Sequence, residues 1–215
     1  YLFAAEAFAS RGYITAIPDY RLYPSVRFPA FLEDAATSVD WLRNRSDREA
    51  TRGKPIYLVG HSAGAYIAAM LELAPRWLAT SGNGVCNTVA AAVGLAGPYD
   101  FLPLKSETLK DIFGPRRDRA TTQPIHYADG KNAPPLLLIS GETDRAVRHR
   151  NSQRLAARLR EIGGRADIWL YDDTGHVGLV ATLAKPLRGL APTLDDTDQF
   201  LRKHRSAKAC SETRQ

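Results

Sequence analysis

The chain has 215 residues and a formal net charge of +6, with 44% hydrophobic and 24% charged residues, which is typical of one globular domain with a sizeable core. Its arginines are spread among Asp and Glu without long runs of like charge, which indicates a solvated surface and no nucleic-acid partner. No apolar run reaches the roughly 18 residues of a membrane span, and the two distant cysteines, Cys86 and Cys210, suggest neither a zinc site nor a dense disulfide framework.

Apolar residues recur at helical spacing in some stretches and form short continuous runs in others. Gly12 ends the first helical stretch, and Pro18 ends the short β-rich run that follows it. In chain order, we expect a helix at residues 1–12, a strand at 13–17, a helix at 28–45, a strand at 55–60, a helix at 62–73, a strand at 89–95, a strand at 134–140, a helix at 151–164, a strand at 166–171 and a helix at 194–203.

This alternation predicts βαβ units and therefore an α/β fold with a mostly parallel sheet covered by helices on both faces. We expect a single domain over residues 1–215. Residues 97–133 are rich in Gly, Pro and charge, with one short apolar-periodic piece, and are expected to form a small cap or lid insert. Residues 205–215 are expected to be a polar C-terminal tail.

The stretch Gly60-His61-Ser62-Ala63-Gly64 has the G-x-S-x-G pattern of a nucleophile elbow. It follows an apolar strand and opens an apolar helix, which is the context that such an elbow needs. We expect strand and helix to crowd together at Gly60 and Gly64, where glycine leaves room because it has no Cβ atom. The Ser62 hydroxyl would then project from the carboxyl end of the sheet, at a helix N-terminus that favours negative charge.

A serine needs a base to take its proton, and in this arrangement the chain order is serine, acid, histidine. Functional residues of open α/β sheets follow the carboxyl ends of the strands. Asp144 follows the strand at 134–140, and His176 follows the strand at 166–171. We therefore predict that Ser62, Asp144 and His176 form a catalytic triad.

Other acids and histidines are possible but fit this rule less well. Glu142 shares the loop of Asp144 and is the strongest rival acid. The remaining rivals are Asp100, Asp172 and Asp173 for the acid, and His61, His126, His149 and His204 for the base. The side chain of His61 is expected to point away from that of Ser62.

Four stretches, "PDYRLYPSVRFPAFLEDAATSVDWL", "GHSAGAYIAAML", "GETDRAV" and "TGHVGL", resemble the α/β-hydrolase superfamily. The resemblance is greatest to bacterial carboxylesterases between the hormone-sensitive-lipase-like esterases and the kynurenine formamidases. It implies an α/β-hydrolase fold, Ser62 as nucleophile, Asp144 as acid and His176 as base. It also implies that the N–H of Ala63 contributes to an oxyanion hole, and that Arg21 and Asp34 form a structural pair.

The sequence departs from this family in one respect. The family carries an HGG-type loop that supplies further oxyanion donors, and no HGG occurs here. Residues 1–12 resemble the helix that follows this loop, so we expect the family's N-terminal strands to be absent from the chain.

These observations predict a serine carboxylesterase that acts on small esters, needs no metal or organic cofactor, and is cytoplasmic and a homodimer. Two alternatives stay open: an arylformamidase with the same triad, and a non-catalytic binding module or inactive fragment. His61, Tyr99 and Phe101 are the predicted substrate-binding residues.

Residues of the insert and of the acid loop add two further questions. Leu102 and Phe113 of the insert could line an acyl pocket together with Tyr99 and Phe101, or all four could merely cover the sheet. Arg145, Arg148 and Arg150 follow the predicted acid and could favour an anionic substrate, or they could belong to a solvated loop.

Overall fold

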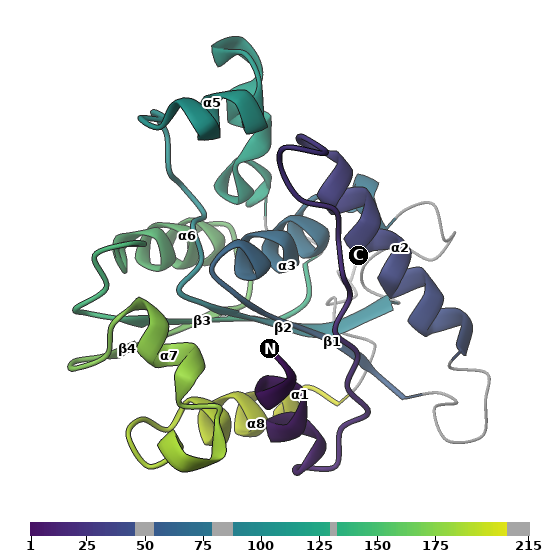
Figure 1. Ribbon diagram of the computed structural model, residues 1–215, viewed down its shortest axis with the longest axis vertical. Helices are drawn as coiled ribbons and strands as arrows, with labels where there is room; N and C mark the ends of the chain where they lie inside the picture. Colours follow the sequence, from purple (N-terminus) through teal and green to yellow (C-terminus); the bar gives the residue numbers. More distant parts are fainter. Residues whose placement is uncertain (46–53, 79–87, 130–132, 206–215) are drawn as a thin grey trace.

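A four-stranded parallel sheet forms the centre of the computed structural model, which describes residues 1–45, 54–78, 88–129 and 133–205 (Figure 1). The strands lie in the order β1-β2-β3-β4, and every neighbouring pair is parallel. Their bounds are β1 Ile56–His61, β2 Val89–Leu95, β3 Leu136–Gly141 and β4 Ala166–Tyr171. Because all four strands run the same way, their carboxyl ends meet at one edge of the sheet.

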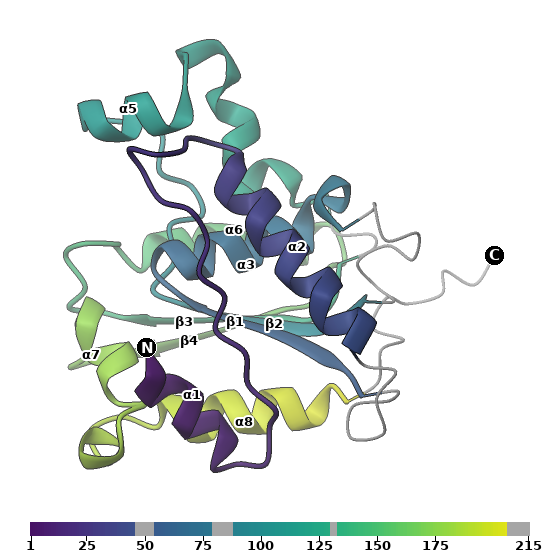
Figure 2. The ribbon, with the colours of Figure 1, turned by 45° about the vertical axis from the view of Figure 1, so that its right-hand side comes forward.

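Helices cover both faces of this sheet (Figures 1 and 2). On one face lie α1 (Leu2–Ala9) and α8 (Thr193–Lys203). On the other lie α2 (Ala30–Arg45), α3 (Ala63–Leu73) and α6 (Arg150–Glu161). Each residue of β2 and β3 is buried, as expected for strands packed on both faces. The predicted α/β architecture is therefore confirmed.

The remaining helices are short. Helix α7 (His176–Ala181) follows β4 and was not predicted. Residues 97–129, within the predicted insert, carry α5 (Glu107–Phe113) and two 3₁₀ helices, and α5 lies beyond α3 (Figure 1). The four 3₁₀ helices of the described residues are η1 Pro75–Trp77, η3 Arg116–Thr122, η4 Pro124–Tyr127 and η5 Lys185–Leu187.

The prediction of a strand at residues 13–17 was wrong. This segment is non-regular chain that runs from α1 on one face of the sheet to α2 on the other (Figure 2). Ile14 is 66% exposed and Ile17 45% exposed. A β-rich composition gives a strand only where a neighbouring strand accepts its hydrogen bonds, and none of the described strands pairs with this segment.

The predicted pairing of Arg21 with Asp34 is confirmed. The guanidinium of Arg21 donates to both carboxylate oxygens of Asp34, at 2.8 and 2.9 Å, and its backbone N–H donates to the same side chain. This pair holds the chain segment before α2 against α2 itself. Cys86, Cys210 and most of the predicted tail lie outside the described residues.

Candidate active site

Three side chains from distant parts of the sequence are joined by hydrogen bonds at the carboxyl edge of the sheet. Ser62 lies in the turn between β1 and α3, Asp144 in the loop after β3, and His176 at the start of α7. The Ser62 hydroxyl donates to Nε2 of His176 at 3.0 Å. Nδ1 of His176 donates to Oδ2 of Asp144 at 2.8 Å. The structure thus brings together the three residues predicted as a triad.

The backbone at Ser62 is in an unusual conformation. Its φ of 55° and ψ of −116° place it where a non-glycine residue rarely lies, at a cost of about 1–3 kcal/mol. The N–H of Ser62 donates to the carbonyl oxygen of Leu95 at 2.8 Å, which ties the turn to β2. Strain of this kind persists when its surroundings hold it, so β2 keeps the serine in place.

One of the two elbow glycines is required by crowding. A Cβ atom on Gly60 would lie 2.2 Å from the carbonyl carbon of Gly64, which is backbone that cannot move aside. A Cβ atom on Gly64 would meet nothing within 4 Å. The prediction of crowding was therefore right for Gly60 and wrong for Gly64, because it is the backbone of Gly64, and not its missing side chain, that approaches the strand.

Ala63 is the first residue of α3 and is exposed. The first N–H groups of a helix have no acceptor within the helix, and the aligned peptide dipoles make this end positive. No acidic residue lies in the first turn of α3 to take up these donors. The N–H of Ala63 is therefore in position to stabilise negative charge that develops next to Ser62.

Asp144 is held tightly in a buried position, with only 4% of its surface exposed. Its Oδ1 accepts hydrogen bonds from the N–H groups of Ala146 and Val147, both at 2.8 Å. Oδ2 is left for the imidazole of His176. A carboxylate fixed in this way can orient the ring and stabilise it when it becomes positively charged.

His61 lies against His176, with 4.8 Å between the centroids of the two rings. Its Nε2 donates to the carbonyl oxygen of His176 at 2.9 Å, and its Nδ1 accepts from the hydroxyl of Tyr1 at 3.2 Å. Burial lowers the pKa of His61, so the neutral ring that these two contacts require is favoured. The predicted substrate contact of His61 is not supported, because protein groups occupy both ring nitrogens.

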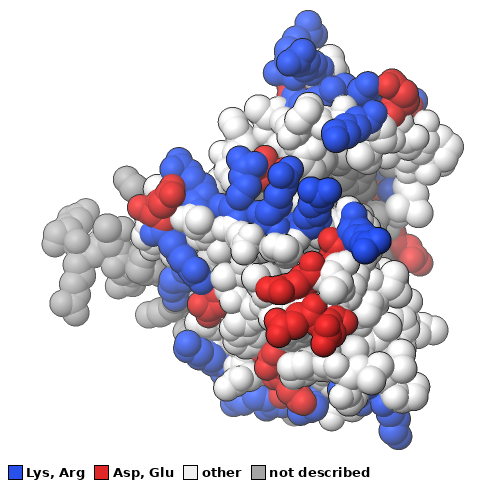
Figure 3. All heavy atoms as spheres, turned by 90° about the vertical axis from the view of Figure 1, so that its left-hand side faces the viewer, with Lys and Arg blue, Asp and Glu red and all other residues white. Residues whose placement is uncertain are grey.

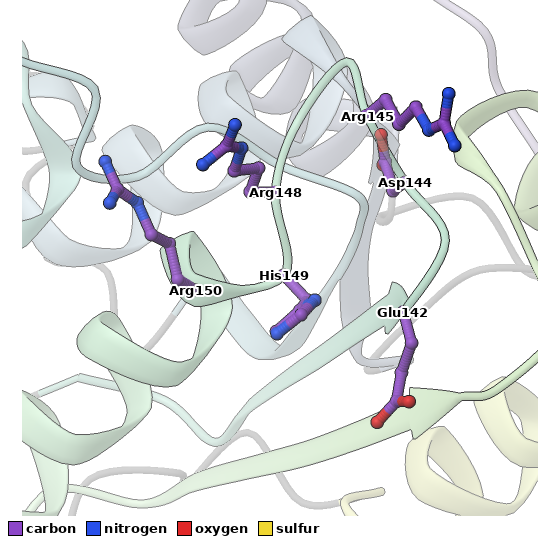
Figure 4. A pocket seen from close by; sticks show the side chains of 6 residues that line it. All are labelled: Glu142, Asp144, Arg145, Arg148, His149 and Arg150. Carbon is purple, nitrogen blue, oxygen red and sulfur yellow. The ribbon is translucent and has the colours of Figure 1, made fainter.

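The rival residues lie elsewhere. Glu142 is exposed and points away from Asp144 (Figure 4). Asp100 forms an ion pair with Arg154 at 2.6 Å. Asp172 and Asp173 are exposed, while the rings of His126 and His204 pack against Tyr127 and Phe200.

The prediction that Tyr99 binds substrate was wrong. Its side chain is fully buried, with an exposed fraction of 0%. Its hydroxyl lies 2.0 Å from where a Cβ atom on Gly94 would be, so the absence of a side chain on that β2 residue makes room for the ring. Tyr99 is thus a core residue that closes the space between β2 and α3.

Phe101 belongs to a cluster of aromatic rings between the insert and α3. Its ring centroid lies 5.9 Å from that of Tyr66 and 5.4 Å from that of Phe113. Phe28 and Phe31 contact Phe113 from the other side. Phe101 is partly buried, and its contact with substrate stays a prediction.

The described residues contain no group of three or more His, Cys, Asp or Glu side chains that could hold a metal ion. Within the same ranges, each helix is too short or too polar to cross a bilayer.

Comparison with known proteins gives the chain a family and a fold. A family model described as BD-FAE matches residues 2–159. Thermogutta terrifontis esterase 2, in a form phosphoramylated by tabun, superimposes with a TM-score of 0.75 at 20% identity, over 93% of this chain and 74% of that one. An esterase/lipase from an uncultured bacterium superimposes with a TM-score of 0.73 at 19% identity, over 94% of this chain and 69% of that one. The chain therefore has the α/β-hydrolase fold.

Curated relatives are similar over most of the chain. A probable isoprenylcysteine alpha-carbonyl methylesterase of Oryza sativa subsp. japonica is 30% identical, over 84% of this chain and 47% of the relative. Esterase LipC of Mycobacterium tuberculosis is 28% identical, over 72% of this chain and 42% of the relative. The kynurenine formamidase of Drosophila melanogaster is 26% identical, over 89% of this chain and 63% of the relative. The chain spans about half the length of the first two relatives.

Proposed function

Because this chain belongs to the BD-FAE family, we propose that it is a serine hydrolase that cleaves small carboxylic esters through an acyl-enzyme on Ser62. The observation that carries the proposal is the continuous hydrogen-bonded path from Ser62 through His176 to Asp144. The likeness in sequence to several proteins named as esterases supports it.

In the first half of the reaction, Nε2 of His176 accepts the hydroxyl proton of Ser62 while Oγ attacks the carbonyl carbon of the ester. The carbonyl oxygen becomes negatively charged and accepts a hydrogen bond from the N–H of Ala63. Asp144 holds the N–H of Nδ1 and stabilises the charged ring. The charged ring then gives its proton to the leaving alcohol, and the acyl group stays on Ser62.

In the second half, water takes the place of the alcohol. Nε2 of His176 accepts a proton from this water, whose oxygen attacks the acyl carbon. The new tetrahedral centre uses the same donor at Ala63. The bond to Oγ then breaks, the proton returns to Ser62, and the carboxylic acid leaves.

The test is hydrolysis of 4-nitrophenyl butyrate together with labelling by a fluorophosphonate probe. We expect the unaltered chain to do both and Ser62→Ala to do neither. Ser10→Ala, which alters an exposed serine at the end of α1, is the matched control and should behave as the unaltered chain. Labelling that survives Ser62→Ala would refute the assignment of the nucleophile. A chain that is neither labelled nor active would favour the alternative of a binding module.

A second candidate function is cleavage of an aryl formamide by the same residues. The similarity to the kynurenine formamidase of Drosophila melanogaster favours it. Hydrolysis of N-formylkynurenine with a kcat/KM well above that for 4-nitrophenyl butyrate would establish it, and the reverse ratio would establish the esterase. A homodimer and a cytoplasmic location stay predictions.

A further inference from the structure

A hollow of about 510 Å³ lies directly beside Asp144 (Figure 4). We call it the arginine hollow; its lining residues are Glu142, Asp144, Arg145, Arg148, His149 and Arg150. Asp144 is part of its wall, and only the imidazole of His176 separates Asp144 from the Ser62 hydroxyl. The arginine hollow therefore shares one wall residue, Asp144, with the proposed triad.

The charges at this hollow are unbalanced. None of the described residues forms an ion pair or hydrogen bond with the guanidinium of Arg145, Arg148 or Arg150. Arginines elsewhere do find carboxylates: the residues paired in this way include Arg11, Arg21, Arg27, Arg154, Arg188 and Arg202. Arg150 is also the first residue of α6, where a positive charge opposes the helix dipole. Three arginines against the carboxylates of Glu142 and Asp144 leave an excess of positive charge at this hollow, which attracts an anion.

Two of the three arginines can act together. Arg148 and Arg150 extend to the same side of the loop, whereas Arg145 and Glu142 point away from them (Figure 4). The face seen in Figure 3 carries a row of Lys and Arg side chains, with Asp and Glu gathered below it. Most acidic groups on this face lie below the basic row, and a few touch it.

The loop that carries these arginines is firmly held, unlike a solvated loop. On one side, Asp144 accepts the N–H groups of Ala146 and Val147, which directly precede Arg148. On the other side, the carbonyl oxygen of Arg148 accepts two hydrogen bonds from Asn151, one from its backbone N–H and one from its side-chain amide. The Oδ1 atom of Asn151 in turn accepts the N–H groups of Tyr99 and Asp100.

Asn151 is 8% exposed, so this link is buried. It joins the loop after β3 to the loop after β2, and the backbone of Arg148 is fixed relative to the proposed triad. The fixed backbone limits the region that the exposed guanidinium of Arg148 can reach.

We propose that Arg148 and Arg150 bind a carboxylate carried by the ester substrate, so that the enzyme prefers esters with a second, anionic group. This inference rests on the proposed esterase function and deepens it. Guanidinium groups suit this role because they are always charged and form charge-assisted, often bidentate hydrogen bonds with carboxylates.

The experiment compares anionic esters with neutral ones. Mono-4-nitrophenyl glutarate carries the charge on the acyl side and is matched by 4-nitrophenyl butyrate, while 3-acetoxybenzoate carries it on the alcohol side and is matched by phenyl acetate. In Arg148→Gln/Arg150→Gln, we expect the KM of at least one anionic ester to rise about tenfold or more. The neutral esters should change less than about twofold, as a guanidinium gains little from an uncharged group.

The control is Arg158→Gln, also on α6, whose side chain is exposed and lies 3.5 Å from Glu161. This variant should leave the KM for all four esters unchanged. Added salt should raise the KM of the preferred anionic ester and not that of its neutral match, because salt screens exposed charges. Equal changes for anionic and neutral esters in the double variant, or the same selective loss in Arg158→Gln, would overturn the proposal.

A binding measurement separates this proposal from the proposed function. In titration calorimetry, the unaltered chain should bind glutarate more tightly than uncharged glutaramide, and the double variant should lose that preference. This readout needs no turnover. Failure to hydrolyse the neutral esters would count against the esterase alone, whereas a missing preference for glutarate would count against the anion site alone.

Discussion

The imidazole of His61 donates a hydrogen bond from Nε2 to the backbone carbonyl of His176, 2.9 Å away. One histidine therefore fixes the backbone of the other, and it does so from the position directly before Ser62. Ser62 and the proposed base are thus connected a second time, apart from the hydrogen bond between their own side chains.

Removing this support should slow the reaction and leave substrate binding largely intact. We expect His61→Ala to lower kcat roughly 10- to 100-fold with little change in KM, because His176 loses its orientation. His61→Gln can still donate to the carbonyl and should recover most of the activity. Steady-state kinetics on 4-nitrophenyl butyrate measure both. Equal losses in the two variants would show that the hydrogen bond has no part in the effect.

Replacing the proposed acid should have a far larger effect. In Asp144→Asn, the amide oxygen should keep the N–H groups of Ala146 and Val147 that Oδ1 accepts, which leaves the NH2 group facing Nδ1 of His176. That donor holds the imidazole in the wrong tautomer, and kcat should fall about 10³- to 10⁴-fold. Asp173→Asn is the matched control, since Asp173 is exposed and lies close to His176 in the sequence. It should keep nearly full activity. A large loss in Asp173→Asn with little loss in Asp144→Asn would reverse the assignment of the acid.

The two elbow glycines should respond differently to the same change. Gly60→Ala forces a Cβ atom against the backbone of Gly64 and should destabilise the fold by about 1–3 kcal/mol or more. Gly64→Ala has free space and lies within α3, where alanine is preferred by roughly 0.5–1 kcal/mol, so it should be neutral or stabilising. Urea unfolding followed by circular dichroism gives both values. Similar losses in both variants would contradict the crowding described here.

Glu72 on α3 should make stability depend on pH. It is 1% exposed, and neither carboxylate oxygen has a hydrogen-bond partner among the described residues. Burial raises its pKa well above the ordinary value of 4.5, and the charge of Arg165 offsets this only in part. The folded state therefore binds the proton more tightly than the unfolded state. The contribution of Glu72 to stability is therefore greatest below pH 4.5 and is lost as the pH rises through the folded-state pKa.

Glu72→Gln removes this titration. The variant should be more stable than the unaltered chain by about 1–3 kcal/mol at pH 7, and the difference should shrink towards pH 4.5. Thermal or urea unfolding at several pH values measures it. Glu161→Gln, at an exposed position of α6, should show no such dependence. A constant difference for Glu72→Gln across the pH range would contradict the raised pKa.

Much of the fold could be predicted because its local signals agree with its packing. The apolar runs at 89–95 and 134–140 became β2 and β3, which are buried on both faces, so nearly every residue in them had to be apolar. Ser62, Asp144 and His176 could be predicted because each follows a strand, and parallel strands bring their carboxyl ends together.

What could not be predicted depends on contacts between distant residues. Residues 13–17 have the composition of a strand, but composition does not reveal whether a neighbour is there to pair with. The sequence allowed Tyr99 either in a pocket or in the core. Its place in the core depends on Gly94, whose missing side chain makes room for the Tyr99 ring. The contact between Tyr1 and His61 joins residues 60 positions apart and left no pattern in the sequence.

Gly141, at the end of β3, lacks the Cβ atom that would otherwise lie 1.7 Å from the carbonyl oxygen of Thr174. Any other residue would push these two backbones apart. Gly141 comes three residues before Asp144, and Thr174 two residues before His176. The segments that carry the proposed acid and the proposed base are therefore in close backbone contact. This backbone contact between the two loops favours the 2.8 Å hydrogen bond between the side chains of Asp144 and His176.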